Sequence, residues 1–242
     1  RNPDPRAKDI ARCLLNFTSE GQYGQFFNPP ANIDISSDFV VFETAKMTND
    51  LKGVLLMMMM VRVWQRMIAS DRNAPFLILI DEAKILLDGK ESSAFISDVA
   101  RNARKYRCAL GLATQSLKDF FGGDNKGSED VWENSSWKVV LQQEPDTISG
   151  LKSHKHLQEF VKDSYRETML RSLGGASTFS EMILFHEDVP CVPCRLYCDP
   201  YSTILYSTTP DEVNNMRKLQ ASGKTLEESI EFTLEKRQGI AA

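Results

Sequence analysis

Two adjacent carboxylates follow an apolar run near the middle of the chain. Asp81 and Glu82 come directly after Phe76–Ile80, five consecutive apolar residues. Such a run is typical of a strand buried on both faces of a parallel sheet, and ligands bind beyond the carboxyl ends of such strands. The pattern is that of a Walker B segment, in which Asp81 would hold Mg²⁺ through its water shell and Glu82 would polarise the attacking water. The alternative is that Asp81 only caps the following helix.

A second apolar run, Ala109–Ala113, ends in the polar residues Thr114, Gln115 and Ser116. A glutamine at this place can contact the γ-phosphate of a nucleotide, or its water, and report whether the nucleotide is intact. Thr114 is predicted to bind the nucleotide beside it. A simple helix cap is the alternative for this dipeptide taken alone, but its position one strand–helix unit after the acidic pair favours the nucleotide role.

Basic residues lie between these two runs. Arg101, Arg104 and Lys105 are spaced three and four apart, so they share one face of a helix. A solvated basic face is one interpretation. The other is that Arg101 binds the nucleotide and Arg104 acts as an arginine finger on a neighbouring subunit's phosphates, a task that suits the planar guanidinium. The strand between Arg104 and Gln115 spans about 16 Å, too far for Arg104 to reach its own chain's nucleotide.

Two other motifs do not support a site. A P-loop requires Gly-x-x-x-x-Gly-Lys-Ser/Thr after a strand, but Lys218 occupies the first glycine position before Gly223–Thr225. We therefore interpret Gly223–Thr225 as a turn. Cys191, Cys194 and Cys198 follow His186 along an extended run. Because alternate residues of a strand point to opposite faces, we expect these cysteines to pack and not to bind zinc.

Composition limits the classes of protein that are possible. The 242 residues are 42% hydrophobic and 26% charged, which excludes collagen and low-complexity disorder. A formal net charge of −4 disfavours a protein that coats nucleic acid. Five unevenly spaced cysteines indicate a reducing compartment. The sequence begins with Arg1 rather than methionine, so we expect a piece of a longer protein.

The elements that must position these residues alternate along the first part of the chain. Apolar runs predict strands at 39–42, 76–80, 109–113 and 137–141, with helices at 50–69 and 92–106. This alternation predicts an α/β fold with a mostly parallel sheet flanked by helices. Residues 54–61 are only eight consecutive apolar residues, far short of the roughly 20 that a bilayer span needs.

The pattern changes after residue 145. A helix is predicted at 153–173, followed by a strand pair at 179–186 and 191–198 and by a helical tail at 210–237, split at Gly223. We therefore predict two parts. Residues 1–145 form part of an ATPase core, and residues 146–242 add strands and helices that pack on it.

Together these segments resemble the TraC-like branch of the large ATPases of type IV secretion and conjugation systems. That branch belongs with the HerA–FtsK group of RecA-like motors. The resemblance covers most of the chain. It is carried by Tyr23–Asn28, Leu77–Ala83, Ala103–Lys105, Ala113–Ser116 and Asp199–Pro210.

The resemblance implies a RecA-like fold and a cytoplasmic, hexamer-forming ATPase peripheral to the bacterial inner membrane. Such a motor uses ATP and Mg²⁺ and works with other secretion-system components in pilus assembly or substrate transfer. By position, Asp81 and Glu82 take the Walker B roles, Gln115 the coupling role and Arg104 the finger role. The missing P-loop implies that this chain is a carboxy-terminal part of the motor domain.

Two alternative functions stay open at this point. One is a DNA-translocating coupling protein of the same superfamily, although the sequence shows neither an anchor nor a basic channel, and direct DNA binding is undecided. The other is a scaffold that does not hydrolyse nucleotide and whose acidic pair only shapes an oligomer interface. Retention of Glu82 argues against the scaffold.

Overall fold

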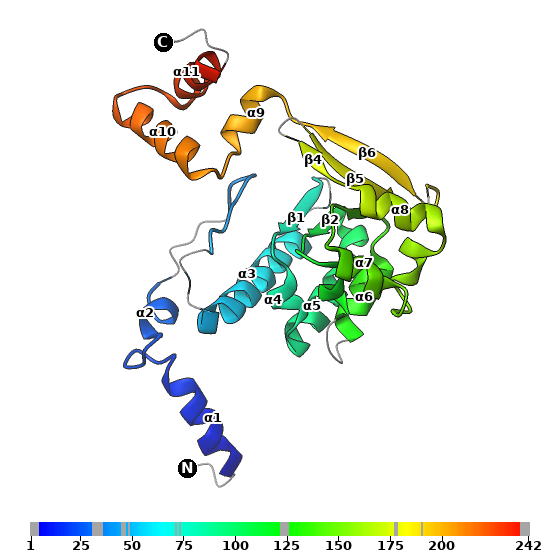
Figure 1. Ribbon diagram of the computed structural model, residues 1–242. Helices are drawn as coiled ribbons and strands as arrows, with labels where there is room; N and C mark the ends of the chain where they lie inside the picture. The colour runs from blue at the N-terminus through cyan, green and yellow to red at the C-terminus, as the bar shows by residue number, and fades with distance from the viewer. Residues whose placement is uncertain are drawn as a thin grey trace. The chain divides into compact units, whose positions relative to one another are not determined.

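The computed structural model describes residues 5–30, 36–44, 47, 49–70, 72, 74–121, 126–176, 179–189 and 191–237. The chain divides into two compact units, residues 1–48 and residues 49–242. Figure 1 labels their helices and strands. The boundary predicted after residue 145 stays a prediction.

The described residues of the first unit include two helices, α1 (Pro5–Leu15) and α2 (Gly24–Phe27), joined by a tight turn. The ring of Phe17 packs on Tyr23 and Phe27, with centroid distances of 5.5 Å and 5.0 Å. Gly24 is required there, because a Cβ atom would lie 2.1 Å from the carbonyl oxygen of Thr18. This close approach explains the glycine inside the aromatic Tyr23–Asn28 segment.

The strand predicted at 39–42 is wrong. These residues have no regular secondary structure, and the side chains of Phe39 and Val41 are 83% and 71% exposed. A strand needs a neighbour for its backbone hydrogen bonds, and none pairs with this segment among the described residues.

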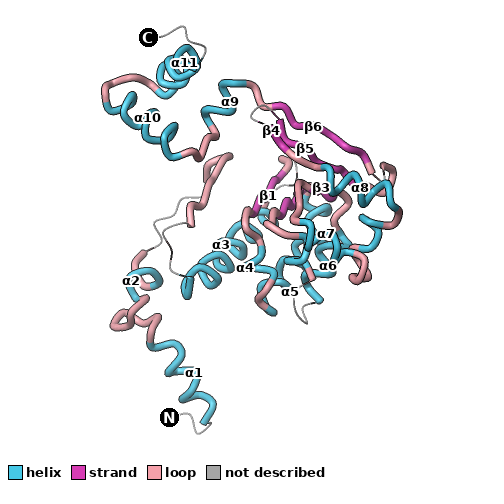
Figure 2. Tube along the Cα trace, in the orientation of Figure 1, coloured by secondary structure: helices cyan, strands magenta, loops and turns pink. Residues whose placement is uncertain are grey.

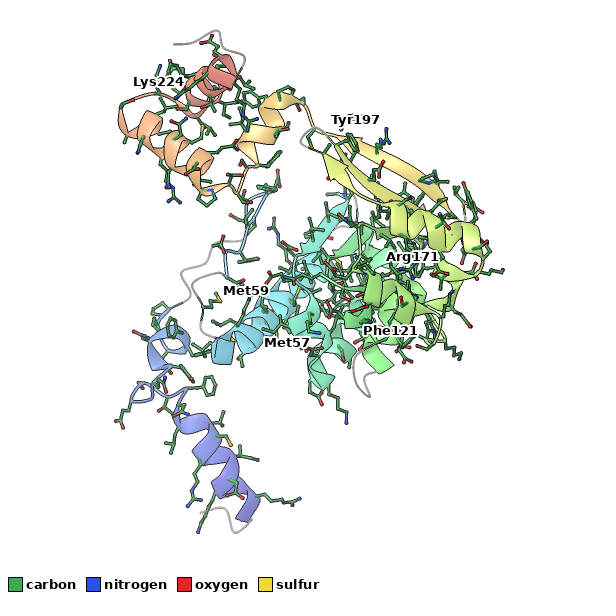
Figure 3. The ribbon with its side chains drawn as sticks, in the orientation of Figure 1. Met57, Met59, Phe121, Arg171, Tyr197 and Lys224 are labelled. Atoms are coloured by element: carbon green, nitrogen blue, oxygen red, sulfur yellow. The ribbon has the colours of Figure 1, made fainter. Side chains whose placement is uncertain are left out.

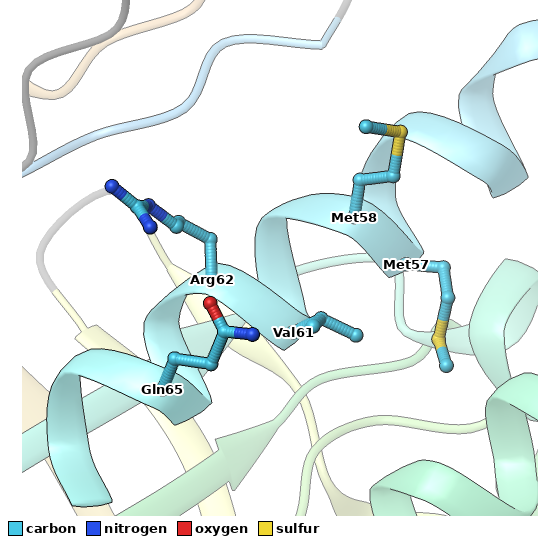
Figure 4. A pocket seen from close by; sticks show the side chains of 5 residues that line it. All are labelled: Met57, Met58, Val61, Arg62 and Gln65. Carbon is cyan, nitrogen blue, oxygen red and sulfur yellow. The ribbon is translucent and has the colours of Figure 1, made fainter. Parts of the chain in front are cut away.

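The second unit begins with α3 (Asn49–Ala69). This helix buries Leu51, Met60 and Met67, and its Trp64 packs edge-on against Tyr106 at 5.8 Å. None of the described helices is both long and apolar enough to cross a membrane. A shallow hollow on α3 is lined by five of its own residues, none of which is a predicted site residue (Figure 4). They are Met57, Met58, Val61, Arg62 and Gln65.

A parallel pair of strands carries the predicted site. β1 (Phe76–Ile80) pairs with β2 (Cys108–Leu112) in a register that sets Ile78 opposite Leu110. Figure 2 shows the strands in magenta. The chain between them forms α4 (Lys84–Leu87), α5 (Lys90–Ala103) and the 3₁₀ helix η1 (Arg104–Tyr106). Both strands and the helix between them are thereby confirmed.

The two faces of β1 differ in burial. Ile78 is 7% exposed and packs with Met67, Ile96 and Val99 from α3 and α5. Leu77 and Leu79, which point to the opposite face, are 71% and 73% exposed. The described helices therefore cover only one face of this sheet.

A second sheet contains the predicted strand pair. β5 (Phe179–Phe185) pairs antiparallel with β6 (Val192–Tyr197) and with the short β4 (Gly175–Ala176). One detail differs from the prediction: β3 (Lys138–Val140) pairs antiparallel with β5 and not in the parallel sheet. The mixed α/β fold is confirmed.

Short helices pack against this second sheet and share a hydrophobic core with it. They are η2 (Leu117–Phe120), α6 (Lys126–Asn134), α7 (Pro145–Leu151), η3 (Gln158–Val161) and α8 (Ser164–Ser172). Their core includes Ile148, Leu151 and Leu170, which are each 1% exposed, with Ile183 of β5 at 0%. The continuous helix predicted at 153–173 is wrong, because Asp163 accepts a hydrogen bond from the Arg166 amide and starts α8 as a separate helix.

The tail forms α9 (Pro200–Leu205), α10 (Pro210–Ala221) and α11 (Leu226–Arg237). α11 contacts both other helices and buries Ile230 completely. Gly223 has a φ of +96°, a left-handed conformation that suits glycine. Nζ of Lys224, which is labelled in Figure 3, lies 5.3 Å from the centroid of the Phe232 ring. Gly223–Thr225 is thus a turn between two helices, as predicted.

Candidate functional site

Backbone hydrogen bonds also join the two segments that follow the carboxyl ends of β1 and β2. The amide of Ala113 donates to the carbonyl of Ile80 at 2.9 Å, and the amide of Ala83 donates to the carbonyl of Ala113 at 2.9 Å. The turn that contains Asp81 and Glu82 therefore lies directly beside the segment that continues to Thr114 and Gln115. Asp81, Glu82 and Gln115 are exposed and Thr114 is half-buried.

Neither polar segment is explained by helix capping. The N-cap residue of α4 is Ala83, and no side chain caps that helix; Asp81 Oδ1 instead accepts from the Glu82 amide at 2.9 Å. On the second segment, Ser116 is the N-cap residue of η2. The capping alternatives for Asp81 and for Thr114–Gln115 are therefore excluded.

Glu82 has an unusual backbone conformation for a residue that bears a Cβ atom. Its φ is +51°, in the left-handed region, which costs about 1–2 kcal/mol outside glycine. Its Oε2 lies 3.7 Å from Nζ of Lys52, a side chain that is 22% exposed on α3. No sequence pattern predicts this contact, because it joins residues 30 positions apart. Arg72 and Arg107, with φ of 63° and 53°, share this conformation, so the backbone strain alone does not mark a functional site.

The strain at Glu82 predicts a stability difference between two substitutions. Glu82→Gly is expected to be more stable than Glu82→Ala by about 0.5–1 kcal/mol in chemical denaturation of the chain, because only glycine relieves the left-handed backbone. Both variants lose the same carboxylate and the same contact with Lys52, so their difference isolates the backbone. Equal stability of the two variants would contradict the strained conformation.

The Gln115 segment is held by a local hydrogen-bond network. The hydroxyl of Thr114 donates to the carbonyl of Ser116 at 3.1 Å. Ser116 and Asp119 form a capping box, in which the Ser116 side chain accepts from the Lys118 amide and Asp119 Oδ2 accepts from the Ser116 amide at 3.2 Å. These bonds fix the backbone immediately after Gln115.

One ion pair connects this network to the helix that follows the acidic turn. Nζ of Lys84 lies 2.7 Å from Oδ1 of Asp119, whose side chain is 11% exposed. The hydrogen bond to Asp119 raises the pKa of Lys84, and the charges of Asp119 and Asp88 add to the effect. Neither Lys84 nor Asp119 was a predicted site residue, because their contact joins residues 35 positions apart.

The basic residues do not join the acidic turn. Arg101, in the last turn of α5, binds Asp130 of α6 and lies 3.9 Å from Asp98. Arg104 and Lys105 are exposed in η1, which enters β2 at its amino end, whereas Gln115 follows the carboxyl end. The separation of Arg104 from Gln115 by the length of β2 is as the sequence predicted.

The residues at the strand ends fit one side of a magnesium–nucleotide site. Carboxylate oxygens, such as those of Asp81 and Glu82, are the ligands that Mg²⁺ prefers. The phosphate cradle that a nucleotide also needs is missing, because the sequence contains no P-loop motif. Within the described residues, no group of three His, Cys, Asp or Glu side chains could hold a metal ion, and the Cys191 region is no exception.

Known proteins are similar to this chain in the region that contains the candidate site. Residues 33–147 match the family described as an AAA-like domain, and this range contains every predicted site residue. Over 236 residues the chain is 25% identical to Protein TraC of Escherichia coli (strain K12), which covers 93% of this chain and 26% of TraC. The resemblance to the TraC-like branch is confirmed.

Two further proteins are similar to the chain, one in sequence and one in fold. Conjugal transfer protein TrbE of Rhizobium radiobacter is 27% identical over 128 residues, which are 53% of this chain and 15% of TrbE. VirB4 of Thermoanaerobacter pseudethanolicus has the same fold, with a TM-score of 0.64 at 19% identity over 82% of this chain and 52% of that one. The TraC-like chain described here thus spans about a quarter of the length of TraC.

Proposed function

We propose that this TraC-like chain is the carboxy-terminal part of a type IV secretion or conjugation motor that hydrolyses ATP with Mg²⁺. The observation that carries the proposal is the backbone link between Ala83 and Ala113, which holds an exposed acidic pair beside an exposed glutamine at the ends of two parallel strands. Ligands of parallel α/β sheets bind beyond the carboxyl ends of the strands, and phosphoryl transfer needs groups that hold the metal, the water and the γ-phosphate close together.

Each side chain has a distinct proposed role. Asp81 would hold Mg²⁺ through water, and Glu82 would orient the attacking water and accept its proton. Thr114 and Gln115 would contact the γ-phosphate and couple its presence to the shape of the loop that continues into η2. Bound ATP and Mg²⁺ would supply the phosphoanhydride bond and the charge neutralisation. A nucleotide contact for Arg101 stays a prediction, since this residue binds Asp130 in the structure.

The remaining parts of the proposal concern assembly. Arg104 would act on the nucleotide of an adjacent subunit in a homo-oligomer, a hexamer by resemblance. The motor would work with other secretion-system components at the inner membrane and energise pilus assembly or substrate transfer. The P-loop would lie in the part of the longer protein that this chain does not contain.

Nucleotide binding by the 242-residue chain tests whether the P-loop lies outside this chain. Without the P-loop's amide donors and lysine, titration calorimetry with ATP and Mg²⁺ is expected to give a Kd no tighter than about 1 mM, and phosphate release is expected at background. A longer protein that adds a P-loop should hydrolyse ATP. Robust ATP turnover by the 242 residues alone would contradict the proposal that the P-loop lies outside this chain. An inactive longer protein would contradict the proposed ATPase activity.

A further inference from the structure

We propose that Lys84 and Asp119 are positioning residues, whose ion pair ties the Gln115 loop to the acidic turn and so sets where Gln115 lies relative to Glu82. The inference rests on the proposed function for its catalytic consequence. Its structural core, the tether, stands on contacts within the chain.

The tether runs through three residues. Lys84 is the first residue of α4, two positions after Glu82, and its Nζ lies 2.7 Å from Oδ1 of Asp119 in η2. The second oxygen of Asp119 accepts from the amide of Ser116 at 3.2 Å. The path therefore starts two residues after Glu82 and ends at the residue next to Gln115.

A second link joins the other end of the Gln115 segment to the acidic turn. The Ala83 amide donates to the Ala113 carbonyl, so the segment 113–116 is fixed to the acidic turn at both of its ends. Gln115 lies between those two anchors. If the side-chain anchor is lost, the backbone hydrogen bond at Ala113 still ties the segment to the turn, and the local bonds of Thr114 and Ser116 stay in place, but Gln115 is held less firmly relative to Glu82.

The surroundings of Asp119 distinguish this pair from an ordinary surface ion pair. Asp119 is 11% exposed and uses both carboxylate oxygens, one for Lys84 and one for Ser116. Lys84 is 55% exposed, and Asp88, at 3.9 Å, is its other acidic neighbour among the described residues. Because Lys84 itself is largely exposed and Asp119 keeps its bond to Ser116, loss of the lysine charge should change global stability by no more than about 1 kcal/mol. A displacement of about 1 Å at a reacting group, in contrast, can lower a rate by about 100-fold.

Hydrogen exchange on the 242-residue chain tests the tether directly. Lys84→Met keeps most of the side-chain length and removes the charge, and exchange at the Ser116 amide is expected to accelerate by about 10-fold or more because Asp119 loses its second anchor. Lys84→Arg should restore slow exchange. Lys90→Met removes an exposed lysine at the start of α5 and is the matched control, which should behave as the parent. Unchanged exchange in Lys84→Met would overturn the tether.

Steady-state kinetics of the longer, P-loop-containing protein test the catalytic consequence. Lys84→Met is expected to lower kcat by about 10-fold or more with KM within about 2-fold of the parent, and Lys84→Arg should recover most of the loss. Accelerated exchange with an unchanged kcat would overturn the positioning role. An inactive parent would overturn the proposed function, and in that case the exchange experiment still decides the tether.

Discussion

Neither Arg104→Ala nor Glu82→Gln subunits of the longer protein are expected to hydrolyse ATP alone, yet mixed rings of the two should regain part of the activity. η1 and Gln115 lie at opposite ends of β2, whose five residues span about 16 Å. In the proposed motor, Arg104 would therefore be too far from a γ-phosphate beside Gln115 of its own chain, and its exposed side chain would act on a neighbour's nucleotide. A finger supplied in trans can contribute about 10³-fold or more to the rate.

The mixing experiment has an internal control in the same helix. Lys105 is exposed beside Arg104, and its Nζ donates to Asn102 Oδ1 at 3.1 Å. Lys105→Ala should therefore leave turnover nearly unchanged. In mixed rings, an intact Glu82 site can lie beside an intact Arg104. A fully active Arg104→Ala protein, or no recovery on mixing when subunits demonstrably exchange, would refute the role in trans.

Glu82→Gln is expected to lower kcat by about 100-fold or more while nucleotide binding is retained. The substitution preserves the shape of the side chain and removes the carboxylate that would accept the proton of the attacking water. The loss should therefore appear in kcat and not in KM. Steady-state hydrolysis by the longer protein, together with nucleotide titration, measures both quantities.

Lys52→Met separates the chemistry of Glu82 from its contact with α3. This variant removes the cation 3.7 Å from Glu82 but keeps the carboxylate, so its effect on kcat should be well below that of Glu82→Gln. If Glu82→Gln instead raises KM and leaves kcat unchanged, Glu82 is a structural or metal-binding residue, and the proposed role is wrong.

The parallel strands could be predicted because their signal is local. An apolar run with a polar stop predicted both β1 and β2, and their shared register brings the two polar stops together. The failed strand at 39–42 has the same local signal. No neighbouring strand pairs with it among the described residues, and the pattern of apolar residues in a segment does not show whether a pairing partner exists.

The partner of β3 and the side-chain contacts between separate elements could not be predicted from the sequence. β3 was found as a strand, but its antiparallel pairing with β5 brings Val140 opposite Ile183, 43 positions away. The same holds for the contacts of Glu82 with Lys52 and of Lys84 with Asp119, which join separate elements. The start of α8 is different, since Asp163 is a local capping signal that could have divided the predicted helix.

The exposed face of β1 affects the solubility of the isolated chain. Leu77 and Leu79 present two large aliphatic side chains to solvent on a strand whose described pairing is with β2 alone. An apolar strand with an open edge is a template for self-association. Concentrated solutions of the 242 residues should therefore tend to form aggregates through this strand, and a single charged side chain at position 77 or 79 would act as a gatekeeper against them.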